Sequence, residues 1–428
     1  MSSSSKRNSK RLSKNITDAS SSPTGRQLGE TYFGACIVLN DVGKDGRSLA
    51  CASGGGYLFT NEEEIKEQRK GIWDMVKKLG GALLEGKDLV SVSLPVYIFE
   101  GRSFLQRLPD LWAFHKLLTK AADEKDPVER FIQVIAFGIA GLHQMCVQKK
   151  PFNPILGETF EATFLHENDP NKDIQLFIEQ TSHHPPISAY EAQGHNFRLH
   201  GYCGYLASIR GNALKGGQVG PTYIDFESDG ATIHYSQPFL WLKGICWGER
   251  VLEYYDKMAF TENKNNLECE VIFNPDQKSF IGSFFSSQKT PVDFLRGEVK
   301  KDGNVIGVIE GSWLGIVHYY PGQTVDTLAS MKDKEKAEVT RKEIFNISKE
   351  VPRYAKPSDD PLPSDARFRE DAVALRNGNL ELAQTKKEEL ENKQRRERAL
   401  RKTGSSRTSL ASNQSGNSEK DLIEATQN

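Results

Sequence analysis

The sequence predicts an α+β protein organised around one large antiparallel β-sheet, and three observations support this fold class. Apolar and polar residues alternate in short runs from residue 160 to about residue 320, as in Leu267–Phe273, where Glu268 and Glu270 separate apolar neighbours. Helical patterns occur before and after this region but not within it. Short strands without long helices between them favour a sheet that curls or closes into a barrel, while a filled β-sandwich stays open as the alternative. Turn-forming residues recur between the runs, at Asn171-Lys172, Gln193-Gly194, Ser228-Asp229-Gly230, Asn274-Pro275 and Lys301-Asp302-Gly303-Asn304.

The composition is that of an ordinary globular protein, and it excludes some classes. The 428 residues suffice for one large domain or for two to three smaller ones. Lys and Arg number 56 against 57 Asp and Glu, so the net charge of −1 argues against a general nucleic-acid-binding protein, and any anion site has to be local. No apolar run reaches the length of a membrane span, and no signal-peptide pattern follows the N-terminus. The six cysteines form no Cys-x-x-Cys pair, which favours reduced thiols.

The two ends of the chain are predicted to be disordered tails. Residues 1–28 are rich in serine, lysine and arginine and hold too little apolar surface to fold alone. A sharper interpretation of this segment is a tether to anionic membranes, at about 1 kcal/mol for each basic residue, which phosphorylation of its serines would weaken. Residues 402–428 are rich in serine, asparagine and glutamine and show no apolar period.

An amphipathic helix is predicted over residues 62–85. Asn61 is a good N-cap, and the glutamates that follow suit the positive end of a helix. Such a helix packs on the protein core in most cases. Gly71, Gly80 and Gly81 weaken it, which suits an element that moves, so a core helix and a mobile helix both stay open. Its apolar residues recur at helical spacing, namely Ile65, Ile72, Trp73, Val76, Leu79 and Leu83.

The next segments are predicted to be a strand and then buried helices. Leu89–Glu100 has the composition of a strand that Pro95 interrupts. Residues 103–148 have helical patterns, with Asp126 as the N-cap of a helix that begins at Pro127. That helix is too apolar all round to lie on a surface, so we expect these helices to pack inside the molecule and to carry no chemistry.

Two rigid segments carry candidate anion-binding residues. In the loop Lys149–Phe160, two prolines and a glycine fix the backbone around Lys150 and Asn153. Glu179–Pro186, with the sequence Glu-Gln-Thr-Ser-His-His-Pro-Pro, follows an apolar strand-like run and presents His183 and His184. Imidazoles change protonation near neutral pH and donate to anions when charged. A zinc site is disfavoured, because adjacent side chains on an extended segment point to opposite faces and no third ligand has suitable spacing.

The C-terminal part is predicted to contain a loop-rich segment and a long polar helix. Residues 321–378 contain many prolines, and Ser364 or Asp365 can cap the helix that follows Leu362–Arg369. Between residues 379 and 401 the chain is polar almost all round, which is typical of a solvated helix. Lys387, Glu391 and Arg395 are spaced four residues apart and therefore lie along one face.

The octet Glu179–Pro186 closely resembles the signature of the oxysterol-binding-protein-related family of lipid-transfer proteins. The Lys149–Phe160 loop and Leu362–Arg369 extend the resemblance over about residues 62–401. It implies a near-closed β-barrel that encloses a lipid tunnel, within a lipid-binding domain of residues 29–401. The parts would be a lid at 62–85, helices at 103–148, the barrel at 160–320 and a C-terminal subdomain at 321–401. The longer members' pleckstrin-homology domain or ankyrin array has no counterpart in the match.

The resemblance also implies which residues bind lipid. His183, His184 and Arg395 would bind the 4-phosphate of phosphatidylinositol 4-phosphate. Its inositol and 1-phosphate would be bound by Lys150, Asn153, Lys387 and Glu391. The lid and tunnel would include Trp73, Val76, Leu94, Ile98 and Leu156. No cofactor, metal ion or catalytic residue is implied.

The function implied is the exchange of phosphatidylinositol 4-phosphate for a counter-lipid between membranes. The family name favours a sterol as counter-lipid, whereas the Ser93-Leu94-Pro95 segment favours phosphatidylserine. A phosphoinositide or sterol sensor without net transfer is the alternative. A phosphoesterase is disfavoured, because no nucleophile elbow, metal cluster or acid pair accompanies the histidines. We expect a cytoplasmic monomer that touches anionic membranes transiently, at contact sites of the endoplasmic reticulum, Golgi or plasma membrane.

Overall fold

The structure is a computed structural model that describes residues 43, 47–79, 85–88, 93–275 and 290–409. The predicted tail of residues 1–28 lies outside the described residues, as do residues 80–84 of the predicted lid and residues 410–428. Within the described part, no helix is both long enough and apolar enough to cross a lipid bilayer.

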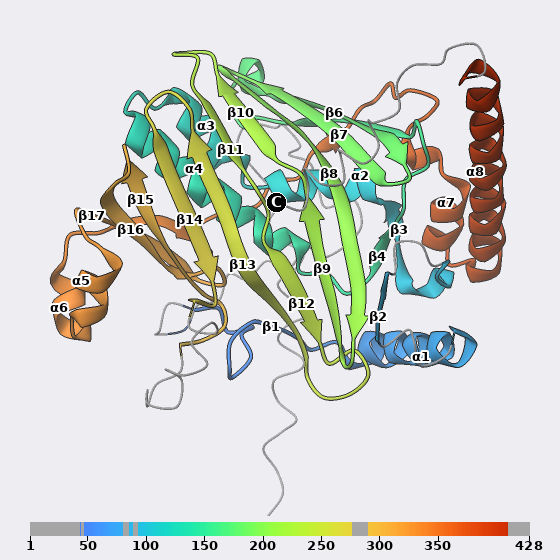
Figure 1. Cartoon of the computed structure of the whole chain (residues 1–428), viewed down its shortest axis with the longest axis horizontal. Coiled ribbons are helices and arrows are strands. Elements are labelled where there is room, and N and C mark those ends of the chain that lie inside the picture. The colour runs from blue at the N-terminus through green and yellow to red at the C-terminus, as the bar shows by residue number, and fades with distance from the viewer. Residues whose placement is uncertain (1–42, 44–46, 80–84, 89–92, 276–289, 410–428) are drawn as a thin grey trace, which may run out of the picture.

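One 17-stranded antiparallel sheet curves around the molecule (Figure 1). Strands β5 to β8 pair in chain order, each antiparallel to the next, and strands β13 to β18 form a second such series, in which α5 and α6 connect β17 to β18. The strands are β1 Tyr57–Phe59, β2 Glu85–Asp88, β5 Thr159–Phe164, β6 Ile174–His183, β7 Pro186–Gly194, β8 Phe197–Arg210, β9 Ala213–Val219, β10 Thr222–Phe226, β11 Thr232–Tyr235, β12 Phe239–Lys243, β13 Arg250–Glu262, β14 Leu267–Phe273, β15 Phe294–Lys301, β16 Asn304–Ser312, β17 Ile316–Pro321, β18 Lys342–Asn346 and β19 Lys356–Pro357.

The two series of hairpins are connected twice, because the long strands β8 and β13 each pair with two shorter strands on one edge. The first half of β8 pairs with β10 and its second half pairs with β9. β10 pairs with β11, which pairs with β13. β9 pairs with β12, which also pairs with β13. The strands form a ring in which β18 pairs with β17 and β19 pairs with β5. No pairing between β18 and β19 is found among the described residues, so the ring is nearly but not fully closed. The predicted fold class is therefore confirmed.

The predicted strand at Leu267–Phe273 and the predicted turn at Lys301-Asp302-Gly303-Asn304 are confirmed, whereas the turn predicted at Gln193-Gly194 is wrong, because β7 continues to Gly194. β14 spans Leu267–Phe273, and Glu268 and Glu270 are exposed while their neighbours are buried. Between β15 and β16, Asp302 and Gly303 both have positive φ, at 50° and 76°. Two successive positive φ values match the twist of a tight hairpin, which explains why Asp-Gly stands there.

A layer of helices fills the concave side of the sheet. Asp126 caps α4, since its carboxylate accepts from the N–H groups of Val128 and Glu129 at 2.8 and 3.0 Å. α4 packs against β13, where a Cβ on Gly138 would lie 3.0 Å from the ring of Phe260. The predicted buried helices are confirmed, as α2 Phe104–Arg107, η3 Leu108–Trp112, α3 His115–Asp123, α4 Pro127–Gly141 and η4 Leu142–Met145.

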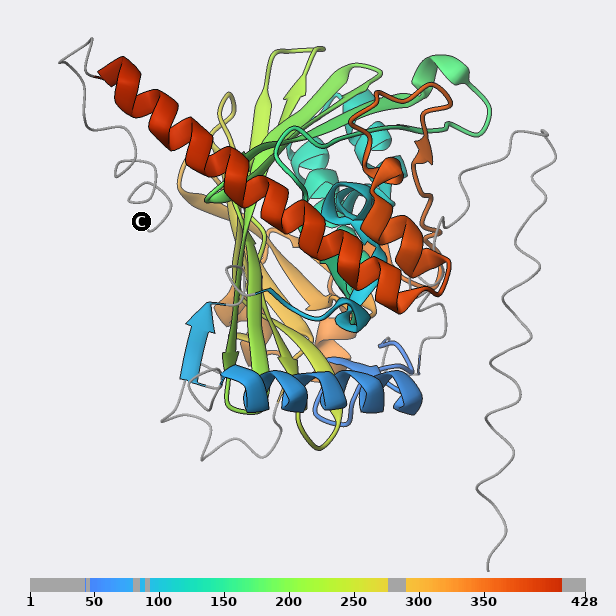
Figure 2. The ribbon, with the colours of Figure 1, turned by 90° about the vertical axis from the view of Figure 1, so that its right-hand side faces the viewer.

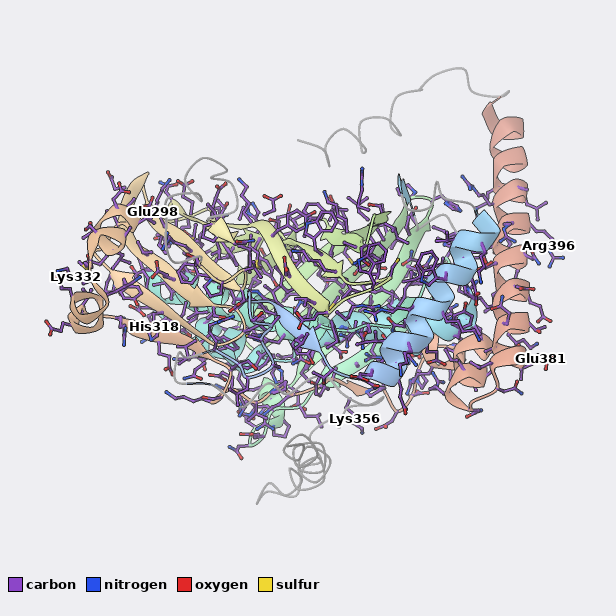
Figure 3. The ribbon with its side chains drawn as sticks, turned by 90° about the horizontal axis from the view of Figure 1, so that it is seen from below. Glu298, His318, Lys332, Lys356, Glu381 and Arg396 are labelled. Carbon is purple, nitrogen blue, oxygen red and sulfur yellow. The ribbon has the colours of Figure 1, made fainter. Side chains whose placement is uncertain are left out.

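The remaining helices lie outside the sheet. α1 runs across the ends of the strands, and α8 crosses obliquely above it (Figure 2). Glu381 and Arg396 point from α8 away from the rest of the molecule (Figure 3). These elements are α1 Glu62–Leu79, η2 Val96–Ile98, η5 Pro170–Lys172, α5 Val325–Ser330, α6 Asp333–Glu338, η8 Ala366–Phe368, α7 Glu370–Arg376 and α8 Leu380–Ser409, together with the parallel pair β3 Phe99–Ser103 and β4 Lys150–Phe152.

Two element predictions differ from the structure. The strand expected over Leu89–Glu100 is wrong between Pro95 and Phe99, because η2 follows Pro95, and only its last two residues lie in a strand, as the start of β3. The preset φ of proline suits the start of a tight turn, and its missing N–H removes a ladder hydrogen bond. The C-terminal helix, in turn, continues to Ser409, past the tail boundary expected at residue 402. A helix once formed gains a hydrogen bond for each added residue, so polar residues extend it.

Candidate functional site

An apolar cavity of about 310 Å³ lies between the helical layer, the sheet and α1. Its walls are formed by side chains of α1, η2, β8, β9, β12 and β13, together with the inner helices. The sheet contributes Leu206, Ile209, Leu214, Leu240, Leu242 and Leu252. Such a cavity suits the hydrocarbon part of a ligand, because apolar chains gain free energy when they leave water.

The five residues predicted for the lid and tunnel fall into two groups. Leu94 and Ile98 line the cavity. Val76 packs against the core beside it, but Trp73 is 43% exposed and Leu156 is 36% exposed, and none of these three lines the cavity. The residues of α1 that line the cavity are Gln68, Ile72 and Met75. Trp73 directly follows Ile72 in sequence, so its side chain lies on a different face of the helix.

A second hollow, of about 140 Å³, brings together every residue predicted to bind the head group. Its wall contains Lys150 and Asn153 from β4 and its loop, His183 and His184 from the β6–β7 turn, and Lys387, Glu391 and Arg395 from α8. Leu94, Lys150 and Asn153 line both hollows, so the polar hollow adjoins the apolar cavity. We call it the head-group hollow.

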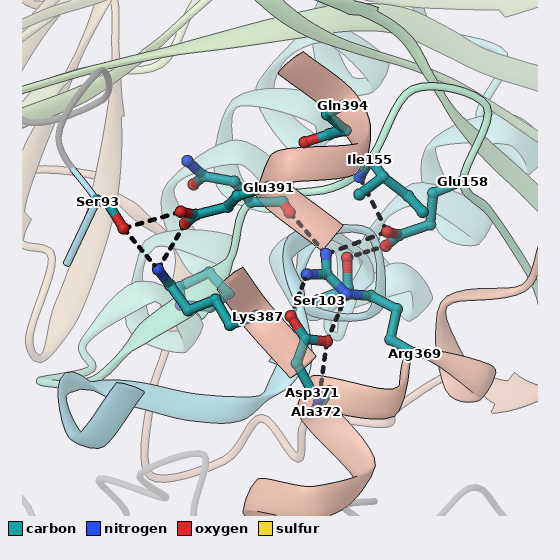
Figure 4. A network of polar contacts seen from close by, with 12 residues as sticks. Ser93, Ser103, Ile155, Glu158, Arg369, Asp371, Ala372, Lys387, Glu391 and Gln394 are labelled. Carbon is teal, nitrogen blue, oxygen red and sulfur yellow. Dashed lines mark hydrogen bonds and ion pairs between the residues drawn. The ribbon is translucent and has the colours of Figure 1, made fainter. Parts of the chain in front are cut away.

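On α8, a row of three residues, Lys387, Glu391 and Arg395, is linked by ion pairs and hydrogen bonds (Figure 4). Glu391 pairs with Lys387 at 2.5 Å and with Arg395 at 3.2 Å. The hydroxyl of Ser93 accepts from the Lys387 ammonium at 3.0 Å and donates to Glu391 at 2.9 Å. The side chain of Lys387 is 5% exposed and that of Arg395 is 62% exposed, so the row runs from the wall of the hollow to its rim.

The two histidines share this hollow although they are adjacent in sequence. Their rings pack edge to face with centroids 4.7 Å apart, and Nδ1 of His183 lies 3.3 Å from Nε2 of Gln394 on α8. The expectation that they point to opposite faces is wrong, because β6 ends at His183 and the alternation stops at the turn. Burial lowers the pKa of His183, and neighbouring His184 adds to this effect.

Lys150 occupies a confined position beside the ring of Phe99. Its ammonium lies 5.2 Å from the centroid of that ring, Lys387 lies 5.6 Å from the same ring, and Lys150 also donates to Oδ1 of Asn153. Burial, together with the charges of Lys387 and Arg369, lowers the pKa of Lys150 to about 7. An anion placed here would favour the charged form.

A buried ionic cluster, which no local sequence pattern indicates, contributes Arg369 and Asp371 to the wall of the head-group hollow. Arg369 donates to Asp371 at 3.0 and 2.7 Å, to Glu158 at 3.1 Å and to the carbonyl of Asn153 at 2.6 Å (Figure 4). It thereby connects the start of α7 to the loop that carries Asn153. Glu158 and Arg369 are 211 residues apart, so no local spacing could have predicted this pair.

The charges of the hollow suit binding of a phosphorylated polar group. Guanidinium and ammonium groups form charge-assisted hydrogen bonds with phosphate oxygens, and Asn153 and Glu391 offer acceptors for hydroxyl groups. Among the described residues, no group of three or more His, Cys, Asp or Glu side chains is placed to hold a metal ion.

Comparison with known proteins gives consistent results. The family model "Oxysterol-binding protein" matches residues 72–415. Oxysterol-binding protein 9 of Dictyostelium discoideum is 39% identical over 81% of this chain and 79% of its own length. Oxysterol-binding protein-related protein 5 of Homo sapiens is 31% identical over 59% of this chain, but the match spans only 28% of that longer protein.

Solved structures share the fold. The Osh1 ORD domain in complex with cholesterol has a TM-score of 0.62 at 23% identity, over 85% of this chain and 84% of that one. The Osh3 ORD of Saccharomyces cerevisiae in complex with PI(4)P has a TM-score of 0.57 at 22% identity, over 78% and 85%.

Proposed function

Because the chain belongs to the oxysterol-binding protein family, whose members bind or transfer lipids and are not enzymes, we propose that it carries phosphatidylinositol 4-phosphate between membranes in exchange for a second lipid. The acyl chains of the phosphoinositide occupy the apolar cavity. Its inositol phosphate occupies the head-group hollow.

One observation carries the proposal: residues from β4, the β6–β7 turn and α8 converge on a hollow that adjoins an apolar cavity. Removal of acyl chains from a bilayer costs about 0.8 kcal/mol for each CH₂ group, and an apolar cavity offsets that cost. Charge-assisted hydrogen bonds then select the head group. The relative that was solved with PI(4)P supports this choice of ligand.

In this proposal, each residue has a chemical role. His183, His184 and Arg395 bind the 4-phosphate, for which the guanidinium offers a fork of N–H donors. Lys150 and Lys387 supply point charges to the 1-phosphate. Asn153 and Glu391 bind hydroxyl groups of the ring, and to do so Glu391 partly exchanges its contact with Ser93 for one with the ligand.

Exchange follows from a shared cavity. Both lipids place hydrocarbon chains between the sheet and the inner helices, so one excludes the other, and Leu94, Lys150 and Asn153 border both hollows. Mutual exclusion couples the two binding equilibria reciprocally, and a gradient of one lipid then drives transport of the other.

The test replaces both histidines with alanine. We expect His183→Ala with His184→Ala to abolish extraction of labelled phosphatidylinositol 4-phosphate from liposomes, while the thermal unfolding midpoint stays close to that of the wild type. His195→Ala is the matched control, since His195 is exposed at the opposite end of β7. Undiminished extraction by the double variant would contradict the proposal. Binding without transfer between donor and acceptor liposomes would identify a sensor instead.

A further inference from the structure

A buried arginine lines the apolar cavity without a carboxylate partner. Arg250, the first residue of β13, is 1% exposed and forms no ion pair among the described residues. Its N–H groups donate to neutral oxygens only, of Gly244 at 3.2 Å, Ile245 at 3.3 Å, Gln68 at 2.8 Å and Gln148 at 3.3 Å. Burial, together with the charge of Arg69, lowers its pKa to about 10. The carboxylate of Glu64, which accepts from Gln148, offsets this charge only in part, because it forms no ion pair with Arg250 among the described residues.

The neighbouring residue Gln68 on α1 has a side-chain donor that forms no hydrogen bond in the described part of the chain. Gln68 lies on α1, is 6% exposed and lines the same cavity. Its Oε1 accepts from Arg250, whereas its buried Nε2 has no hydrogen-bond partner in the described part of the chain. An unpaired buried donor costs about 1–3 kcal/mol. This end of the cavity therefore has more donors than acceptors.

This polar pair is separate from the head-group hollow. Gln68 and Arg250 come from α1 and the start of β13 and do not line the head-group hollow. Conversely, His183 and Lys387 do not line the apolar cavity. In Figure 2, α1 lies below α8, at the ends of the strands. One apolar cavity is thus bordered by two different polar sites.

We propose that Arg250 and Gln68 bind the anionic head group of the second lipid, through its carboxylate or phosphate oxygens. Such a group compensates the buried charge and supplies acceptors to the guanidinium and to Nε2 of Gln68. A lipid whose polar part is a single hydroxyl leaves the charge uncompensated. The inference rests on the proposed function, because both lipids use the same cavity while different residues recognise their head groups.

The hydrogen bond between Arg250 and Gln68 also holds α1 against the start of β13. Arg69 on α1 contributes to this contact, because it donates to the carbonyls of Gly244 and Gly248 in the turn between β12 and β13. A purely structural role of Arg250 would weaken closure of α1 and change the extraction of all lipids alike. Selective loss of one class of lipid therefore distinguishes recognition from closure.

The experiment measures extraction of labelled lipids from phosphatidylcholine liposomes in four arms. These arms contain phosphatidylserine, phosphatidic acid, a sterol or phosphatidylinositol 4-phosphate. We expect the wild type to extract phosphatidylserine or phosphatidic acid. Arg250→Met should reduce that extraction about tenfold or more, as for loss of a charged hydrogen bond. Extraction of phosphatidylinositol 4-phosphate should change less than about twofold. The first two arms distinguish a carboxylate ligand from a phosphate ligand.

Two further variants control for folding and for charge. Gln68→Met removes only the amide and, like Arg250→Met, should reduce the extraction of phosphatidylserine or phosphatidic acid. Arg198→Met replaces an exposed arginine that pairs with Glu191, and it should have no effect on extraction. His183→Ala with His184→Ala should lose the phosphoinositide and keep the second lipid. The inference is overturned if the wild type extracts sterol but neither phosphatidylserine nor phosphatidic acid, or if Arg250→Met reduces every arm equally. Absence of phosphoinositide extraction by the wild type would instead overturn the proposed function.

Discussion

Lys150 is a lysine whose charge at neutral pH depends on its surroundings. Burial and the charges of Lys387 and Arg369 lower its pKa to about 7 in the empty protein. A bound phosphate raises that pKa again, because an opposite charge favours the protonated form. Binding therefore takes up a proton, so affinity is full below pH 7 and decreases as the pH rises above it.

This linkage predicts a pH dependence that one substitution removes. Between about pH 7 and 9, wild-type affinity for phosphatidylinositol 4-phosphate should decrease by up to about tenfold for each pH unit, the limit for one proton. Lys150→Arg stays charged in this range and should give a nearly flat profile. Equilibrium extraction at several pH values measures both slopes, and equal slopes would contradict the linkage. Burial lowers the pKa of His183, but His183 is the same in both proteins, so its contribution cancels from the difference between the two slopes.

The buried ionic cluster predicts a large loss of stability. Arg369→Met leaves the carboxylates of Glu158 and Asp371 without their cation, in a position where both are nearly fully buried. Removal of one partner of a buried pair costs about 3–5 kcal/mol. Urea denaturation should show this decrease, and Arg396→Met, on the solvent side of α8, should change the free energy of unfolding by less than about 0.5 kcal/mol. A decrease below 1 kcal/mol for Arg369→Met would be inconsistent with this role.

At the scale of elements, the sequence predicted what local patterns determine. The alternation in β14 and the apolar, capped α4 need no distant partner to be recognised. The cavity-facing side of α1 depends on packing, so Trp73, which adjoins Ile72, is assigned to the wrong face by apolar character alone. The turn at Val96–Ile98 likewise replaces an expected strand.

Gly71 shows that a glycine in α1 has a packing role beside the flexibility inferred from sequence. A Cβ at this position would lie 2.4 Å from Cε2 of Tyr97 in η2. We expect Gly71→Ala to push α1 away from η2, although alanine raises helix propensity by about 1 kcal/mol. Hydrogen exchange of the amides in Glu62–Leu79 should become faster in this variant. Tyr97→Ala in the same chain should restore protection, and unchanged exchange in the single variant would refute the packing role.

At the scale of the whole molecule, function depends on segments that meet only in the folded chain. The sequence identified Lys150, His183 and Lys387 as separate candidates, but their common hollow results from the curvature of the sheet and the course of α8. Ser93 and Arg369 carry no local signal for their roles, because Lys387, which donates to Ser93, and Glu158, which accepts from Arg369, are 294 and 211 residues away in the chain. The polar pair at Arg250 is hidden for the same reason.

A crystal structure of the protein loaded with phosphatidylinositol 4-phosphate tests the central claim most directly. We expect the 4-phosphate within hydrogen-bond distance of His183, His184 and Arg395, and the acyl chains in the cavity bordered by Leu94 and Ile98. A head group bound elsewhere on the surface, or acyl chains outside this cavity, would contradict the account.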